Sequence, residues 1–365
     1  MGDAHRIGVV GLGVISRAYL DTLVGRSAVR VTAVADLDAS RSAAVAAELP
    51  GVRALSVEDL LSSPDVDTVL NLTIPAAHAE IAHGAIGHGK HVYGEKPLAA
   101  ELTDARTVLE AAAKAGVGVG CAPDTVLGTG VQTARAAVDA GAVGRPLFAS
   151  AVMVTPGHER WHPQPDFYYR PGGGPLLDMG PYYLTSLVHL LGPVRAVIGA
   201  SSRLRPERVI GSGPRAGERI PVEVDSHVSG VLEHEGGALT TLTTSFDGVA
   251  TTAAPIEVHG ESGTLSVPDP NIFDGEVRLL ELGGDQWRTL PPSAGYVGAG
   301  RGVGLLDFVA ADGERAPRAS GELALHVLET MTALLRSAAE GRRIELSTSV
   351  ARPVPVPLTS AEEWR

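Results

Sequence analysis

One lysine stands out as a candidate for chemistry. Of the 30 Lys and Arg residues in the chain, only Lys90, Lys96 and Lys114 are lysines. Lys96 lies in Gly94-Glu95-Lys96-Pro97, directly after the short apolar run 91–93. An ammonium group is compact and its pKa responds readily to its surroundings, which suits a group that holds or exchanges a proton. We interpret Lys96 as a residue at the edge of a sheet where ligands bind. Lys90 and Lys114 are interpreted as solvated charges near helix ends.

A glycine-rich turn supplies a second kind of chemistry, the binding of phosphate. Gly11-Leu12-Gly13-Val14-Ile15-Ser16 follows the apolar run 6–10 and opens a helical stretch that ends near Gly25. In this context two glycines let the backbone approach a pyrophosphate at the N-terminus of a helix. Ser16 stands where the third glycine is usual, and a small residue suffices for helix packing there. We predict that Gly11, Gly13, Val14 and Ile15 bind a dinucleotide.

An acidic residue narrows the identity of that dinucleotide. Asp36 lies 20 residues beyond Ser16, at the end of the β-branched run 29–35. A carboxylate in this position accepts hydrogen bonds from the adenosine ribose and repels a 2′-phosphate. Leu37 follows, where an Arg or Ser would favour such a phosphate. The sequence therefore predicts NAD rather than NADP.

The elements that must position these residues alternate between strand and helix. Apolar strands are expected at 6–10, 29–35, 68–74, 91–93 and 117–121, with helical segments between them. This alternation predicts a doubly wound parallel sheet of the Rossmann α/β class, covered by helices on both faces. We place this NAD-binding domain at residues 1–123.

The pattern changes after residue 145. Longer alternating segments, such as 222–232 and 239–246, predict an α+β domain with a large, mostly antiparallel sheet at residues 124–365. Helices are expected at 128–140, 176–191 and 321–340, and long surface loops at 205–219 and 291–318.

Polar and aromatic residues cluster near the start of this second domain. Directional hydrogen-bonding groups beside aromatic rings suit a carbohydrate, whose C–H faces pack on rings. The alternative is a surface loop whose aromatic residues cover the edge of a domain. A metal site is not expected, because His158 and His162 would need a helix to converge and prolines flank them. The candidate substrate residues are Asp124, Thr125, His158, Trp161, Tyr168 and Arg170.

Composition excludes several classes of function. The net charge of −12 and the absence of a Lys/Arg run argue against nucleic-acid and anionic-membrane partners. The first residues do not resemble a signal peptide, and no window of about 18 apolar residues indicates a membrane span. A single cysteine, Cys121, rules out an intramolecular disulfide, so a cytoplasmic location is expected.

Several separated motifs together resemble the Gfo/Idh/MocA family, named for glucose-fructose oxidoreductase and inositol dehydrogenase. They are Gly11-x-Gly13, Thr73-Ile74-Pro75 with His78, Glu95-Lys96-Pro97, the run from Gly172 to Tyr182, and Glu322 to Glu329. The resemblance implies that Thr73, Ile74, Pro75, His78, Glu95 and Lys96 serve the cofactor. It also implies that Lys96, Asp178 and Tyr182 form the hydride-transfer site, with Asp178 and Tyr182 touching substrate, and that the second domain's sheet forms a homodimer or homotetramer.

Tyr182 makes the resemblance more specific. Many inositol-dehydrogenase-like members have His at this position, whereas the glucose-fructose and dihydrodiol branches use Tyr. A phenol with a pKa near ~10 is a poor base until a neighbouring cation lowers that pKa, and Lys96 could be that cation. Either Tyr182 or Lys96 would then exchange the proton of the substrate hydroxyl, with Asp178 orienting one of them.

The expected function is an NAD-dependent oxidoreductase that transfers a hydride between nicotinamide and a secondary alcohol or carbonyl of a sugar, polyol or sugar derivative. One alternative retains NAD and uses transient oxidation at C3 to eliminate the aglycone of a glycoside. Another is a non-catalytic dinucleotide sensor, against which the intact Lys96, Asp178 and Tyr182 argue. The sugar, the carbon that is oxidised and the size of the oligomer stay open.

Overall fold

The computed structural model describes residues 4–311 and 315–364, and the chain divides into two compact units. The first unit comprises the chain up to Leu127, Tyr296–Leu325 and the residues from Thr359, and the second comprises Gly128–Gly295 and His326–Leu358. The boundary expected at residue 123 placed 296–325 in the second domain, whereas the structure places this segment in the first unit. The reason is local pairing, because the amide of Cys121 donates to the carbonyl of Ala319 over 3.0 Å.

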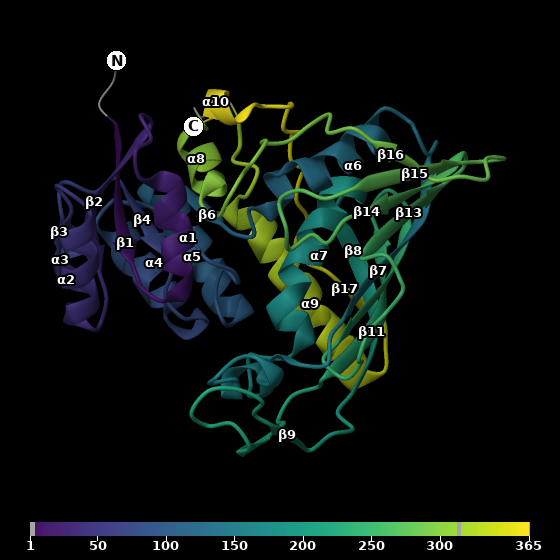
Figure 1. Ribbon diagram of the computed structural model, residues 1–365, viewed down its shortest axis with the longest axis horizontal. Coiled ribbons are helices and arrows are strands. Elements are labelled where there is room, and N and C mark those ends of the chain that lie inside the picture. The colour runs from purple at the N-terminus through teal and green to yellow at the C-terminus, as the bar shows by residue number, and fades with distance from the viewer. Residues whose placement is uncertain (1–3, 312–314, 365) are drawn as a thin grey trace. The chain divides into compact units, whose positions relative to one another are not determined.

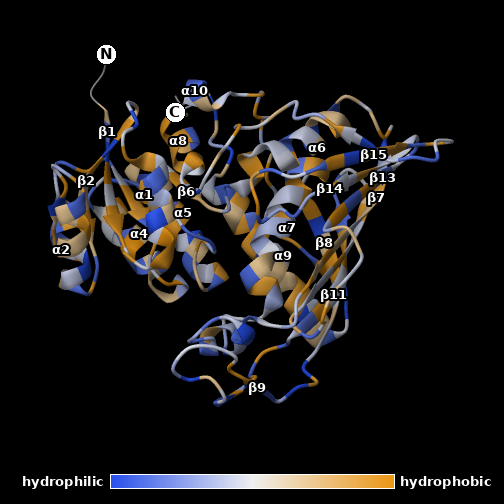
Figure 2. Ribbon diagram, in the orientation of Figure 1, coloured by the Kyte–Doolittle hydropathy of each residue, from blue (hydrophilic) through white to orange (hydrophobic). Residues whose placement is uncertain are grey.

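The first unit contains a six-stranded sheet in the order β3-β2-β1-β4-β5-β6, and each neighbouring pair is parallel. This is the doubly wound order that the strand–helix alternation predicted, so the expected fold class is confirmed. The order reverses between β1 and β4, and ligands of such sheets bind at the carboxyl ends of the strands beside this point. Figure 2 shows hydrophobic residues on the strands and their covering helices, with hydrophilic residues interspersed along the helices.

The strands are β1 (His5–Val10), β2 (Val29–Ala35), β3 (Arg53–Ala54), β4 (Thr68–Asn71), β5 (His91–Gly94) and β6 (Val119–Cys121). The helices are α1 (Val14–Leu23), α2 (Ala39–Glu48), α3 (Val57–Ser62), α4 (His78–Gly87), α5 (Leu102–Ala115), α8 (Val303–Val309) and α10 (Ala361–Trp364).

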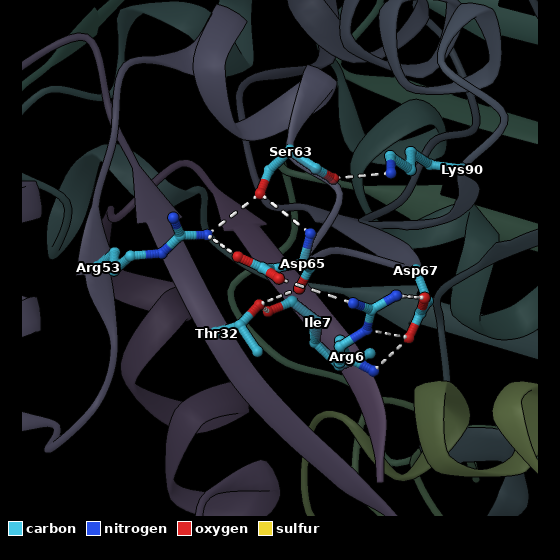
Figure 3. A network of polar contacts seen from close by, with 8 residues as sticks. All are labelled: Arg6, Ile7, Thr32, Arg53, Ser63, Asp65, Asp67 and Lys90. Atoms are coloured by element: carbon cyan, nitrogen blue, oxygen red, sulfur yellow. Dashed lines mark hydrogen bonds and ion pairs between the residues drawn. The ribbon is translucent and has the colours of Figure 1, made fainter. Parts of the chain in front are cut away.

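A polar network closes the amino-terminal edge of the parallel sheet (Figure 3). Arg6 donates to Asp67 through its backbone amide at 2.8 Å and through two guanidinium nitrogens, and Arg53 donates to Asp65 at 2.9 Å. The ammonium of Lys90 donates to the carbonyl of Ser63 over 2.7 Å, so this expected solvated charge is part of the network. These contacts fix the edge opposite to the glycine turn.

The second unit contains a nine-stranded sheet in the order β16-β15-β14-β13-β7-β12-β11-β8-β17. The β7–β12 pair is parallel and the other neighbours are antiparallel, which confirms the expected α+β class. Figure 1 shows α6, α7 and α9 together on one face of this sheet. Burial alternates along β12, as expected for a sheet with one covered face.

The strands of this unit are β7 (Pro146–Val154), β8 (Val194–Ser202), β9 (Glu207–Val209), β10 (Arg219–Pro221), β11 (His227–His234), β12 (Leu239–Ser245), β13 (Ile256–Gly260), β14 (Gly263–Val267), β15 (Val277–Glu281), β16 (Arg288–Leu290) and β17 (Ile344–Glu345). The helices are α6 (Thr129–Asp139), α7 (Pro175–Leu191) and most of α9 (Gly321–Glu340), which confirm the three expected helices. The residues of α9 up to Leu325 belong to the first unit.

Both expected long loops contain short elements. The segment 205–219 holds β9 and the start of its partner β10, and 291–318 holds α8. Strands of three residues and a helix of seven are too short for a hydrophobic period to reveal. In the part of the chain that the structure describes, no helix is both long and apolar enough to cross a membrane.

Candidate functional site

The glycine turn of the first unit forms a cradle for an anion. Gly11 has φ +92°, and a Cβ there would lie 2.7 Å from the carbonyl carbon and oxygen of Leu72, so only glycine fits. Gly13 is the N-cap of α1, has no side-chain cap, and a Cβ built on it would meet nothing within 4 Å. Open space thus adjoins the start of α1 and the fully exposed Val14, and the first amides of a helix lack intrahelical acceptors. Backbone donors at a helix N-terminus in this arrangement fit a pyrophosphate.

Asp36 is fixed beside this turn by two backbone amides. Its Oδ2 accepts from the amide of Leu12 over 2.7 Å, and its Oδ1 accepts from the amide of Asp38 over 2.9 Å. Each carboxylate oxygen has two lone pairs, so both can still accept a hydroxyl donor. Leu37, the next residue, is almost fully exposed. The carboxylate is therefore held immediately after β2, beside the glycine turn.

The segment after β4 is linked internally through His78. Thr73 donates its hydroxyl to Asn71 Oδ1 over 2.6 Å, whereas Ile74 is largely exposed. His78 is only 2% exposed, with Nδ1 2.6 Å from the Pro97 carbonyl oxygen and Nε2 3.0 Å from that of Thr73. Burial lowers the pKa of the imidazole, so the neutral ring donates to one carbonyl at a time. These contacts give His78 the position of a link between two loops.

Glu95 fixes the backbone of Lys96. Its Oε1 accepts from the hydroxyl of Tyr19 over 2.8 Å and its Oε2 accepts from the amide of Lys96 over 3.0 Å. Burial, with Glu95 beside it, raises the pKa of Tyr19 well above its usual value, so the phenol keeps its proton and stays a donor. Burial also raises the pKa of the adjacent Cys121 thiol, which is therefore inert at neutral pH. Sequence reasoning missed Tyr19, because its place in an apolar helix resembles that of any core residue.

Asp124 and Thr125 occupy a structural position. Both are 0% exposed. The Asp124 carboxylate accepts from the amides of Gly302 at 2.7 Å and Gly304 at 3.2 Å, where α8 begins, and lies 3.7 Å from Arg301. It is thus a cap for α8. We expected these two residues to bind substrate; in this structure both are buried, and the Asp124 carboxylate accepts from the start of α8.

In the second unit, α7 places Asp178 and Tyr182 on one face. The two residues are four apart in the helix, so their side chains lie one above the other. Asp178 is partly exposed, and its Oδ2 lies 2.9 Å from Nε2 of His158. Tyr182 is 6% exposed. The structure therefore brings together His158 and Asp178, which lie 20 residues apart in the sequence.

Aromatic rings surround His158. Its ring centroid lies 5.3 Å from that of Trp161, 4.6 Å from that of Tyr168 and 4.6 Å from that of Phe246. Three of the expected substrate residues, His158, Trp161 and Tyr168, thus form one cluster with Asp178. Arg170 is largely exposed and lies 3.9 Å from Asp166. The sequence offered no signal for Phe246, which comes from the end of β12.

Within residues 4–311 and 315–364, no three His, Cys, Asp or Glu side chains gather in a way that could hold a metal ion.

Comparisons with known families match both units. Residues 5–122 match the family described as "Oxidoreductase family, NAD-binding Rossmann fold", and residues 131–266 match the "GFO/IDH/MocA C-terminal domain".

Named relatives extend over most of the chain. The chain is 31% identical over 361 residues to 1,5-anhydro-D-fructose reductase of Ensifer adhaerens, covering 95% of this chain and 100% of that protein. It is 30% identical over 269 residues to inositol 2-dehydrogenase 3 of Saccharopolyspora erythraea, covering 73% of each. An NAD binding oxidoreductase from Klebsiella pneumoniae has the same fold, with a TM-score of 0.82 and 24% identity over 95% of this chain and 100% of that one.

Proposed function

The chain belongs to the GFO/IDH/MocA family of NAD-binding oxidoreductases, and from this membership we propose that it transfers a hydride between a nicotinamide dinucleotide and a sugar or polyol. The observation that carries the proposal is the open space at Gly13, the N-cap of α1, where no side chain caps the start of the helix. Two of the chain's named relatives are a reductase and a dehydrogenase, which favours net oxidation or reduction over glycoside elimination.

The first unit contains the groups that would hold the cofactor. Gly11, Gly13, Val14 and Ile15 would bind the pyrophosphate through backbone amides, and Thr73, Ile74 and Pro75 would line the adjoining loop after β4. Glu95 and His78 would act indirectly, since their contacts fix Lys96 and Pro97. Bound there, a nicotinamide dinucleotide would supply the hydride acceptor.

Asp36 supports NAD over NADP. Its carboxylate is held by two amides next to the glycine turn, so it has little freedom to move away from an approaching phosphate. A 2′-phosphate beside it would place like charges in contact, whereas ribose hydroxyls would donate to its free lone pairs.

Proton transfer is assigned to Lys96 or Tyr182. The Lys96 backbone is fixed by the Glu95 carboxylate, and Tyr182 is fixed by the packing of α7. Either group would accept the hydroxyl proton as the carbon is oxidised, and return it in the reverse direction. Asp178 would orient the substrate hydroxyl and His158, to which it is hydrogen bonded.

The second unit supports a carbohydrate as the substrate. His158 and Asp178 offer directional polar groups, and Trp161 and Tyr168 offer rings on which C–H faces pack. The names of the two curated relatives, a 1,5-anhydro-D-fructose reductase and an inositol 2-dehydrogenase, point to the same class.

The face of the nine-stranded sheet away from α6, α7 and α9 supports self-association. Phe148, Ile198 and Leu239 are each about half exposed on its strands, although such large apolar side chains favour burial. A dimer or tetramer formed through this face would cover them. Light scattering of the purified protein measures the assembly directly.

Absorbance of the reduced nicotinamide tests the proposed function. The full chain with NAD and a panel of aldoses, inositols and anhydrosugars should produce this absorbance, and NADP should give a clearly lower rate. Lys96→Met removes the ammonium while keeping a side chain of similar length, so it should lower kcat by at least about 100-fold. Lys114→Met is the matched control and should leave kcat unchanged. Inertness of the wild type across the whole panel would contradict the proposal.

A further inference from the structure

Four aromatic rings form an exposed rim in the loop before α7. We call Trp161, His162, Phe167 and Tyr168 the aromatic rim. Ring centroids lie 5.4 Å apart for Trp161 and His162, 5.4 Å for His162 and Phe167, and 4.0 Å for Phe167 and Tyr168. Trp161 is 59% exposed and Phe167 is 55% exposed. Contiguous exposed apolar surface of this kind marks a binding site more often than an isolated exposed side chain does.

The rim is continuous with the substrate face through His158. The imidazole meets the Asp178 carboxylate through Nε2, while its ring packs against Trp161 and Tyr168. Phe167 lies one ring farther out, in contact with Tyr168 and His162. A sugar ring held by Asp178 and His158 would therefore have the rim beside it.

A buried ion-pair cluster holds the rim in place. Arg208 of β9 is 2% exposed in its side chain; it lies 3.3 Å from Glu159 and 2.5 Å from Asp247, and its guanidinium lies 5.3 Å from the centre of the Tyr169 ring. The Tyr169 hydroxyl also donates to Glu159. Glu159 and Tyr169 are the sequence neighbours of His158 and Tyr168, so the cluster fixes both short turns that carry the rim. Figure 1 shows β9 in a small lobe beyond the large sheet.

Several arginines near the rim pair with carboxylates. Arg215 and Arg170 both pair with Asp166, at 2.6 and 3.9 Å, and Arg208 pairs with two carboxylates. Burial also lowers the pKa of His162, which keeps this rim residue uncharged at neutral pH. Arg208 and Arg215 are thus engaged by carboxylates, and the rim itself consists of ring faces.

We propose that the aromatic rim is a subsite for the second ring of a glycoside, so that the preferred substrate is a sugar joined through its glycosidic oxygen to another sugar ring or to an aryl group. The inference rests on the proposed function, in which Asp178 and His158 bind the ring that is oxidised. A preorganised aromatic surface loses little conformational freedom on binding, and stacking on it adds affinity beyond simple burial.

Matched substrates test the rim. The full chain is assayed with NAD and with the methyl glycoside, the phenyl glycoside and a disaccharide of whichever sugar it oxidises fastest. The wild type should show kcat/KM about tenfold higher for one or both extended substrates than for the methyl glycoside. The phenyl and disaccharide arms distinguish an aryl group from a sugar. Phe167→Ala should bring this ratio to about 1, and Trp287→Ala, which truncates an exposed tryptophan near the β16 strand, should leave it unchanged.

Three results would overturn the subsite. They are a wild-type ratio near 1, a ratio that Phe167→Ala does not change, and a smaller oligomer of Phe167→Ala by light scattering, which would make the rim a subunit contact. Titration of tryptophan fluorescence with the phenyl glycoside and the disaccharide measures binding without turnover. It therefore distinguishes failure of the subsite from failure of the proposed function. Binding that weakens in Phe167→Ala without any turnover supports the rim and rejects hydride transfer. Turnover without a rim effect rejects the rim alone.

Discussion

At the residue scale, the two glycines of the turn have different physical roles. The folded backbone itself requires glycine at position 11, because a side chain at φ +92° is strained and its Cβ would overlap the backbone of Leu72. Gly13 has φ −73° and open space where its Cβ would be, so the folded chain alone does not require glycine there. The requirement at Gly13 comes from the ligand, whose phosphates must approach the backbone.

This difference predicts opposite outcomes for two alanine substitutions. Gly11→Ala should lower the free energy of unfolding by at least about 2 kcal/mol, from backbone strain and the overlap with Leu72. Gly13→Ala should change it by less than about 0.5 kcal/mol, yet weaken NADH binding about tenfold or more. Urea unfolding and fluorescence titration with NADH measure the two effects. Wild-type affinity in Gly13→Ala would show that the cradle is not the phosphate site.

At the scale of elements, α1 contributes to both the expected phosphate site and the support of Lys96. Its first turn presents amides at Gly13, and Tyr19, farther along, donates to Glu95. Glu95 in turn accepts from the amide of Lys96. One helix therefore fixes the expected phosphate site and the backbone of the expected catalytic lysine.

Tyr19→Phe tests this brace. The substitution leaves Glu95 buried with one donor fewer, which should cost about 1–3 kcal/mol of stability. It should also lower kcat several-fold, because Lys96 loses part of the support for its orientation, with little effect on NADH affinity. Tyr183→Phe removes a buried hydroxyl from α7 and serves as the control, with kcat unchanged. Equal kcat values for Tyr19→Phe and the wild type would reject the positioning role.

At the scale of the whole molecule, buried histidines predict sensitivity to acid. His234 donates from Nδ1 to the carbonyl of Gly192 and accepts at Nε2 from the hydroxyl of Thr240. Burial lowers its pKa to about 4, and burial also lowers the pKa of His326 and His78. The unfolded chain binds protons to these groups near pH 6.5, whereas the native chain binds them only at lower pH, so stability falls as the pH decreases below about 6.5.

His234→Gln isolates one part of this effect. A glutamine amide can donate and accept as the neutral imidazole does, but it does not titrate. Between pH 7 and pH 4.5 the free energy of unfolding of the wild type should fall more steeply than that of the variant, with a difference of up to about 3 kcal/mol. Urea unfolding at several pH values measures it. Parallel pH profiles for the two proteins would mean that His234 titrates normally.

The sequence by itself determined the fold class, the order of most elements and the dinucleotide motif. Apolar strands that alternate with helices have few ways to bury both faces of a sheet, and a glycine turn between a strand and a helix has few conformations. The resemblance, carried by motifs such as Glu95-Lys96-Pro97, predicted the family that the comparisons then showed. Each of these signals is local, because it depends on residues within a few positions of one another.

The tertiary structure alone decided which polar residues meet. It pairs Asp178 with His158 and Tyr19 with Glu95, and it gives Asp124 to the start of α8, where the sequence suggested a substrate contact. It also places Tyr296–Leu325 in the first unit. The buried Arg208 fixes the turns that carry the aromatic rim. These pairings join residues from 20 to about 180 positions apart. Hydrogen bonding and burial at such separations depend on how the sheets and helices pack, which no local pattern specifies.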